Sequence, residues 1–238
     1  MQSKNPIFIM GHPRSGTTIT AWLLGHHPQI SYIEAETNIF NLEVEKLIKS
    51  PFRALAVDVY RAYLSQVLKS DVWKKSFEVL EDDLLTDPNP YPSLRRFFDS
   101  LLKDPSKDSF VEKTPLHLFY ADTIRKVYPD AIFLIPIRDE QEIIRSMAKK
   151  EWCPLTESGK QMFFDIIQWE IHRVQEKTSS LSRVYTFKLD DMAQCPEVLI
   201  SLVHPYFEDI WDSLRDAHKK RVERGIPKGD SKTWKRMA

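Results

Sequence analysis

The sequence reads IFIMGHPRSGTT from Ile7 to Thr18, and this run is the strongest indication of the fold class. Its leading apolar run predicts a buried strand, and the spacing from Gly11 to Gly16 matches the phosphate-binding pattern G-x-x-x-x-G-K-[ST] except at one position. Thr17 stands where that pattern has lysine. In a nucleoside triphosphatase this lysine reaches the β- and γ-phosphates, so its loss argues against ordinary ATP or GTP hydrolysis.

The loop nevertheless keeps the means to hold an anion. Its amide groups lie at a predicted helix N-terminus, where the helix dipole favours negative charge. Arg14 returns a cation to the loop, and its planar guanidinium can bind two oxygens at once. We therefore expect Arg14 and the amides of Ser15, Gly16, Thr17 and Thr18 to bind an anionic ligand.

Length and composition limit the class of protein. At 238 residues the chain is long enough for one sizeable α/β domain, which we expect to span residues 1–238. There are 34 Lys and Arg residues together and 34 Asp and Glu residues together. The chain therefore has no net positive charge that would favour binding to nucleic acid or to an anionic membrane. There is no signal sequence, no apolar run of membrane-spanning length, and no metal-binding pattern around Cys153 or Cys195. These features predict a cytoplasmic protein without a metal site.

Apolar runs and helix signals alternate along the chain. Strands are predicted at residues 5–11, 30–33, 109–112, 131–137 and 184–189. Helices are predicted at 16–24, from Thr114-Pro115 to Pro129, at 140–152 behind the capping residue Asp139, and at 157–180. This alternation predicts an α/β fold with a mainly parallel central sheet flanked by helices.

The segment from about residue 38 to 108 does not follow this alternation. Its apolar residues, such as Leu55 and Val59, recur at helical spacing. We therefore expect a helical insertion lying over the sheet.

Charged residues follow several of the predicted strands. Arg14, Glu112, Lys113 and Arg138 each come at or just after the end of a strand. Ligands of parallel sheets bind beyond the carboxyl ends of the strands, so we expect one crevice to hold these side chains together.

Three motifs, taken in order, resemble the sulfotransferases that use 3'-phosphoadenosine 5'-phosphosulfate (PAPS). They are Pro13-Arg14-Ser15-Gly16-Thr17-Thr18, Glu112-Lys113-Thr114-Pro115, and Arg138-Asp139 followed by Ser146-Met147. The chain is most similar to the bacterial and tyrosylprotein-type branch, over about residues 5–40 and 109–200. The resemblance implies a P-loop-type three-layer fold. It also implies transfer of the sulfuryl group from PAPS to an acceptor hydroxyl, or to an amine, without a metal, releasing adenosine 3',5'-bisphosphate.

The resemblance also implies roles for individual residues. The loop from Arg14 to Thr18 would bind the 5'-phosphosulfate, while Arg138 and Ser146 would bind the 3'-phosphate. Lys113 matches a lysine that stabilises the leaving phosphate in those enzymes. Arg138 can contact a phosphate with two donors, and Ser146 lies two helical turns further on with a hydroxyl donor.

The catalytic base and the C-terminal contacts come from two further segments. Glu36 before Thr37 is similar to the segment that supplies a catalytic glutamate, and Glu34 or a histidine remains an alternative base. Near the C-terminus, Arg224-Gly225 is similar to a cofactor loop of cytosolic sulfotransferases. The segment Ser231-Lys232-Thr233-Trp234 is instead similar to a Ser-Lys-Trp segment of the bacterial and tyrosylprotein-type branch, and these two alignments are alternatives. Arg224 and Ser231 are therefore candidate cofactor contacts.

Two other functions fit parts of the sequence. One is a P-loop kinase or nucleotide hydrolase with an altered loop, which would require ATP and Mg²⁺. The other is a non-catalytic nucleotide-binding protein. We favour the sulfotransferase because a candidate base and a leaving-group cation accompany the binding residues. The sequence leaves open whether the acceptor is a small molecule, a carbohydrate or a peptide, and it leaves the oligomeric state open.

Overall fold

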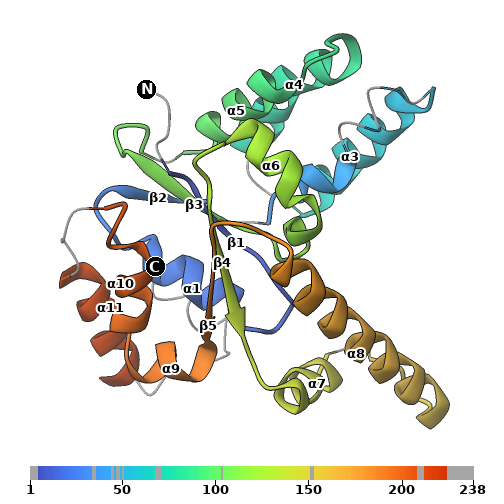
Figure 1. The fold of residues 1–238 in the computed structure, drawn as a ribbon. Helices are drawn as coiled ribbons and strands as arrows, with labels where there is room; N and C mark the ends of the chain where they lie inside the picture. The colour runs from blue at the N-terminus through green and yellow to red at the C-terminus, as the bar shows by residue number, and fades with distance from the viewer. Residues whose placement is uncertain are drawn as a thin grey trace.

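A five-stranded parallel sheet forms the centre of the molecule (Figure 1). The computed structural model describes residues 5–33, 36–43, 46, 49, 51–67, 71–102, 104–150, 153–207 and 212–223. The strands, in spatial order, are β2 (Ile30–Tyr32), β3 (Ser109–Lys113), β1 (Ile7–Ile9), β4 (Ile132–Ile137) and β5 (Val184–Lys188). The predicted α/β fold with a central parallel sheet is confirmed.

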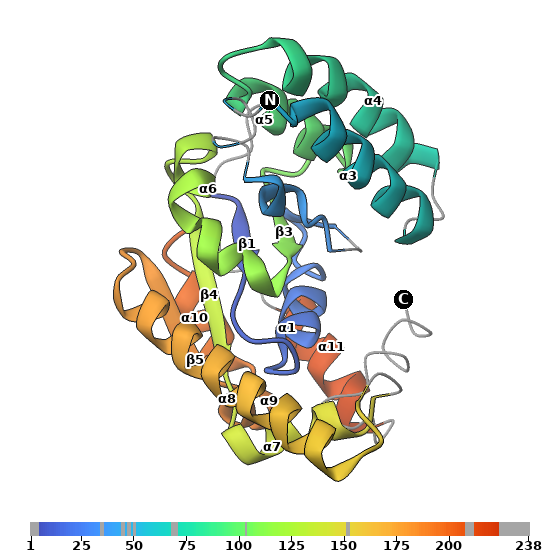
Figure 2. The same ribbon diagram turned by 90° about the vertical axis from the view of Figure 1, so that its right-hand side faces the viewer.

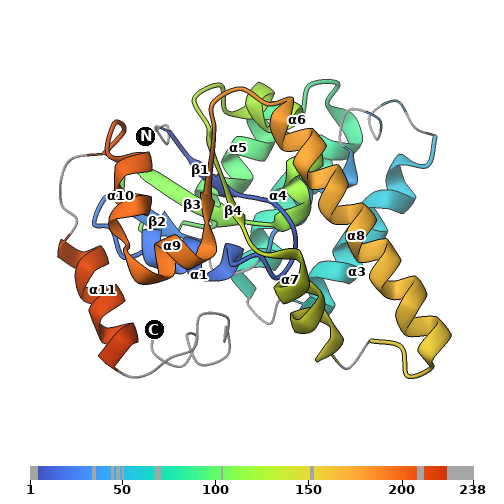
Figure 3. The ribbon, with the colours of Figure 1, turned by 60° about the horizontal axis from the view of Figure 1, so that its bottom comes forward.

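Helices cover both faces of this sheet (Figure 3). One face carries α1 (Thr17–Leu24), α9 (Leu189–Gln194), α10 (Glu197–Val203) and α11 (Asp212–Glu223). The other carries the 3-10 helix η2 (Pro115–Tyr120), α6 (Ala121–Val127) and α8 (Glu157–Ser179), while α7 (Glu140–Ala148) packs against α8 beyond the end of β4. Within the described ranges, no helix combines the length and apolarity needed to cross a membrane.

The segment between β2 and β3 is helical. It contains η1 (Ile39–Leu42), α3 (Arg53–Val67), α4 (Asp71–Thr86) and α5 (Tyr91–Ser100), and Figure 2 shows α3 to α5 at the opposite end of the molecule from α7 and α8. The apolar spacing that indicates a helix at α3 does not mark its buried face. Leu55 and Val59 are 60% and 61% exposed, whereas Val57 and Tyr60 are buried, because the packing partner Phe77 of α4 lies on that other side.

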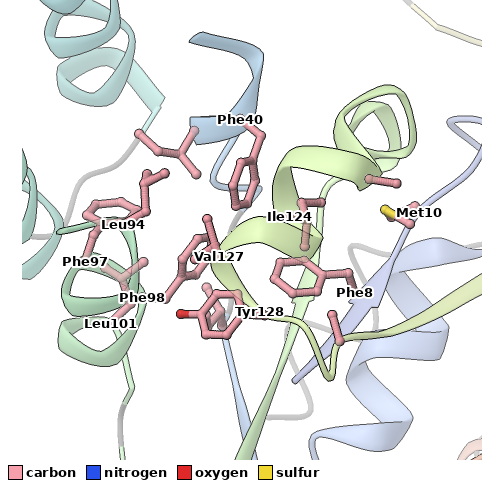
Figure 4. Packing of buried hydrophobic residues seen from close by; sticks show 14 of the residues in the cluster. Phe8, Met10, Phe40, Leu94, Phe97, Phe98, Leu101, Ile124, Val127 and Tyr128 are labelled. Carbon is pink, nitrogen blue, oxygen red and sulfur yellow. The ribbon is translucent and has the colours of Figure 1, made fainter. Parts of the chain in front are cut away.

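Phe8 of β1 is the centre of an aromatic core on the insertion side (Figure 4). Its ring centroid lies 5.8–6.3 Å from five other rings, those of Phe40, Phe98, Phe110, Tyr128 and Phe133. Such pairs add about 0.5–1.5 kcal/mol each beyond the burial of their area. The strand that leads into the Gly11–Gly16 loop is therefore held by residues of the insertion as well as by its own sheet.

Candidate active site

The loop between β1 and α1 needs glycine at its last position. Gly16 has φ 102°, and a Cβ atom there would lie 2.4 Å from Leu189 Cδ1. Arg14 also adopts a left-handed conformation, with φ 73°. The loop is tied to its neighbour by a hydrogen bond of 3.0 Å from the amide of Gly11 to the carbonyl of Pro115. The strained turn is thus held in place by its neighbours in two other segments, around Pro115 and Leu189.

Replacing Gly16 with alanine should lower the free energy of unfolding by about 1–3 kcal/mol from the backbone conformation, and the contact with Leu189 adds to this loss. Denaturant unfolding measures the effect as a lower midpoint. The double variant Gly16→Ala/Leu189→Ala should lose less stability than the sum of the two single variants, because it removes the clash. Strict additivity would show that Leu189 does not restrict this position.

The N-terminus of α1 offers amide donors to a ligand. The helix begins at Thr17, and its cap residue Gly16 provides no side chain to bind the first amides. The hydroxyl of Ser15 donates to the carbonyl of His12 at 2.7 Å, so it shapes the loop. Thr17, in the position of the missing lysine, is 4% exposed. The anion-binding capacity of the loop therefore lies in its amides and in Arg14.

Two arginines and a serine meet on one side of the loop. Arg14 Nε donates to Ser146 Oγ at 3.0 Å, and Arg138 Nη1 donates to the carbonyl oxygen of Arg14 at 3.0 Å. Partial burial and the nearby charge of Arg138 lower the pKa of Arg14. Glu142, four residues further on, accepts from Arg138 Nε at 2.9 Å. Two like charges in a half-buried position form a site that a phosphate would stabilise.

The helix that carries Ser146 begins as predicted. The side chain of Asp139 accepts a hydrogen bond of 3.1 Å from the amide of Glu142, which confirms the cap of α7. This cap fixes the direction in which α7 leaves β4, and with it the place of Ser146 beside Arg14.

Lys113 and Glu36 form an ion pair on the other side of the loop. Lys113 is the last residue of β3 and pairs in register with Ile9 of β1, immediately before the loop. The side chain of Lys113 is 9% exposed, and that of Glu36 is 41% exposed. A candidate base and a candidate leaving-group cation are therefore in direct contact, and the carboxylate of Glu36 is open to a ligand.

A buried carboxylate lies next to this pair. Glu112 is fully buried and accepts hydrogen bonds from Thr37, Thr114 and His117. Burial alone would raise the pKa of Glu112, but the neighbouring His117 and these hydrogen bonds hold it below its usual value. The helix predicted from Thr114-Pro115 begins instead as the 3-10 helix η2, and the hydroxyl of Thr114 does not cap it but donates to Glu112 at 2.5 Å.

The part of the chain that contains these site residues matches a known protein family. The model of the sulfotransferase family, described as "Sulfotransferase family", matches residues 6–199. The chain belongs to the sulfotransferase family. The match contains the loop, Lys113, Arg138 and Ser146, and membership implies a sulfuryl donor and an acceptor substrate.

Solved sulfotransferases share the fold of this family member. The sulfotransferase domain from the curacin biosynthetic pathway has a TM-score of 0.57 at 15% identity and covers 90% of this chain and 77% of its own. A sulfotransferase from Mycobacterium avium has a TM-score of 0.54 at 16% identity. That match covers 95% of this chain and 70% of the other. A sulfotransferase from Mycobacterium tuberculosis H37Rv has a TM-score of 0.52 at 19% identity. That match covers 94% of this chain and 74% of the mycobacterial one.

A curated relative is much longer than this sulfotransferase-family chain. A protein of Aquifex aeolicus (strain VF5), described as uncharacterized, is 22% identical over 98% of this chain. The chain spans only 31% of the length of that relative.

A cavity of about 280 Å³ lies between β4 and α8 of this sulfotransferase-family chain. Its lining includes Ile135, Ile171 and Val174, together with His12, Ser15 and Arg138. His12 is 3% exposed, and its Nε2 lies 3.5 Å from Glu170 Oε2 without forming a hydrogen bond. No sequence pattern indicates this cavity, because its walls come from segments that are distant along the chain.

Some predicted site residues fall outside the described part of this sulfotransferase-family chain. Arg224, Ser231 and the alternative base Glu34 lie outside the described residues. The two C-terminal residues also lie beyond the part that the family model matches. Among the residues that the structure describes, no group of three or more His, Cys, Asp or Glu side chains is placed to hold a metal ion.

Proposed function

We propose that this chain transfers the sulfuryl group of PAPS to an acceptor hydroxyl, with an amine as a less favoured acceptor, and releases adenosine 3',5'-bisphosphate. The observation that carries the proposal is the layout around the loop. The Lys113–Glu36 ion pair lies on the β3 side, and the cluster of Arg14, Arg138 and Ser146 lies on the β4 side. A donor with one anionic group on the 5' position of its ribose and another on the 3' position suits this layout.

The residues at the loop fit the anionic groups of such a donor. Arg14 and the amides from Ser15 to Thr18 would hold the 5'-phosphosulfate, since the helix that starts there has no side-chain cap. Arg138 and Ser146 would hold the 3'-phosphate. None of the described residues accepts a hydrogen bond from Arg138 Nη2, so this group is available to a phosphate oxygen.

Glu36 and Lys113 would carry the proton transfer and the charge stabilisation. When bound, PAPS supplies the sulfuryl group, and the bond that breaks joins its sulfur to the 5'-phosphate oxygen. Glu36 would accept the proton of the acceptor hydroxyl while the oxygen of that hydroxyl forms its bond to sulfur. Lys113 donates to the oxygen that leaves with the 5'-phosphate and so stabilises its growing negative charge. These fixed groups can serve the transfer without a metal.

The single experiment that tests the function has two steps. Thermal-shift measurements with adenosine bisphosphate, AMP and ATP test the donor site, and the bisphosphate should stabilise the protein most. Mass spectrometry of small-molecule, carbohydrate and peptide hydroxyl compounds incubated with PAPS then tests transfer. Mg²⁺-dependent ATP turnover without any use of PAPS would instead indicate a kinase or hydrolase. Bisphosphate binding without a sulfated product would indicate a non-catalytic nucleotide-binding protein.

Substitution of Arg138 by alanine should separate the two phosphates of the ligand. We expect binding of adenosine 3',5'-bisphosphate to weaken by about 10- to 100-fold, because a charge-assisted hydrogen bond is lost, while binding of AMP changes little. Isothermal calorimetry measures both affinities. The matched control is Arg145→Ala, since Arg145 is exposed on α7, the helix that follows Arg138, and donates to the carbonyl of Gln141. Equal weakening of both ligands would remove the 3'-phosphate assignment.

A further inference from the structure

The proposed chemistry leaves one buried charged group without a task. Glu112 is 0% exposed and cannot reach a substrate. Its Oε1 accepts from the amide of Thr37 at 3.2 Å, from the hydroxyl of Thr37 at 3.0 Å and from the hydroxyl of Thr114 at 2.5 Å. Its Oε2 lies 3.1 Å from His117 Nδ1. Since the carboxylate can only accept, Nδ1 carries the hydrogen.

Burying the carboxylate of Glu112 lowers the stability of the fold unless hydrogen bonds compensate for it. Moving a carboxylate out of water costs several kcal/mol, and donors must compensate that cost. An apolar side chain could fill the same space without the penalty. What Glu112 adds is a fixed geometry, because one group binds donors from three segments: residues 36–38, the end of β3, and η2.

Specific contacts join the described residues on either side of positions 34 and 35 to the sheet. On the N-terminal side, the amide of Ile33 donates to the carbonyl of Val111 in β3, at 3.1 Å. Residues 36–38 have no regular secondary structure. They return to β3 through Thr37, which binds Glu112, and through the amide of Asn38, which lies 3.4 Å from Thr114 Oγ1.

We propose that Glu112 is a positioning residue: by fixing Thr37, its buried carboxylate holds Glu36 against Lys113. Glu112 and Lys113 are neighbours on β3, and Glu36 and Thr37 are neighbours on the facing segment. The hydrogen bond between Thr37 and Glu112 therefore also sets the distance between Glu36 and Lys113. The hydroxyl of Tyr60 donates to the carbonyl of Thr37, which links the same point to α3 of the insertion. The inference rests on the proposed function for the roles of Glu36 and Lys113.

The least disruptive test compares two variants of Thr37. Thr37→Val keeps the shape and the amide donor but removes the hydroxyl, whereas Thr37→Ser keeps the hydroxyl. Loss of a hydrogen bond to a charged group predicts a fall in kcat of about tenfold for Thr37→Val. The KM for PAPS and the affinity for adenosine bisphosphate should stay unchanged. Thr37→Ser should keep most of the wild-type kcat, and equal kcat values for the two variants would overturn the proposal.

A double-mutant cycle shows whether the effect passes through Glu36. In the Glu36→Gln background, Thr37→Val should change the residual rate by less than about twofold, because the group that Thr37 positions has already lost its function. If the two losses simply multiply, Thr37 acts independently of Glu36 and the proposal fails. A general loss of folding would instead appear as a lower melting temperature in both backgrounds.

Amide hydrogen exchange tests the positioning without any turnover. In Glu112→Gln the amides of Thr37 and Asn38 should exchange faster than in the wild type, while that of Val111 within β3 should not change. Unchanged exchange at both amides would overturn the proposal. If the wild type forms no sulfated product, the proposed function fails, and the exchange result alone decides whether Glu112 holds this segment.

Discussion

Glu36→Gln should lower kcat by about 10²- to 10⁴-fold, which is the usual contribution of a positioned general base. The amide has nearly the same shape as the carboxylate but cannot accept the proton of the acceptor. Binding of adenosine bisphosphate should be retained, because Glu36 contacts Lys113 and is not part of the arginine cluster. Steady-state rates with PAPS and calorimetry with the bisphosphate measure the two effects separately.

Glu43→Gln is the matched control for this variant. Glu43 lies seven residues further along the chain, at the end of η1, and pairs with Lys46 at 2.8 Å. Its replacement should leave kcat at the wild-type value. Unchanged turnover in Glu36→Gln would move the base to Glu34 or to a histidine.

Lys113→Met should lower kcat by about 10²- to 10³-fold, which is the loss typical of removing one transition-state donor. Methionine has a similar length and suits a side chain that is 9% exposed, so the change is mainly one of charge. Lys113→Arg keeps the charge and should recover part of the rate. Rates at saturating PAPS separate kcat from the KM for the donor.

The control for this variant is Lys126→Met. Lys126 is exposed in the last turn of α6, which leads into the start of β4 and therefore lies at the opposite edge of the sheet. A higher KM for PAPS in Lys113→Met with an unchanged kcat would show that Lys113 serves only to bind the donor.

Local patterns predicted much of the fold. The apolar runs that became β1 and β4 are fully or almost fully buried, and the predicted cap Asp139 forms its hydrogen bond. Each of these features depends on residues a few positions apart. The inward face of α3 could not be predicted in this way. The spacing of Leu55 and Val59 indicates a helix, but the position of the partner helix decides which side is buried.

The candidate site also combines residues that local patterns predicted with contacts that they could not predict. The motifs indicated that Arg14, Lys113 and Arg138 gather at one edge of the sheet, because parallel strands bring their carboxyl ends together. The contact between Arg14 and Ser146 joins residues 132 positions apart, and that between Thr37 and Glu112 joins residues 75 apart. No local pattern encodes such pairs. In the sequence, the acidic residue Glu112 near the end of a predicted strand was the available signal for the network around it.

The aromatic core around Phe8 limits how the helical segment between β2 and β3 can be exchanged. Phe40 and Phe98 come from the helical segment between β2 and β3, and both rings pack on the strand that leads into the loop. A chimaera that takes this whole segment from another family member would therefore exchange part of the support beneath the proposed donor site. A graft confined to the outward residues of α3 would leave that support in place.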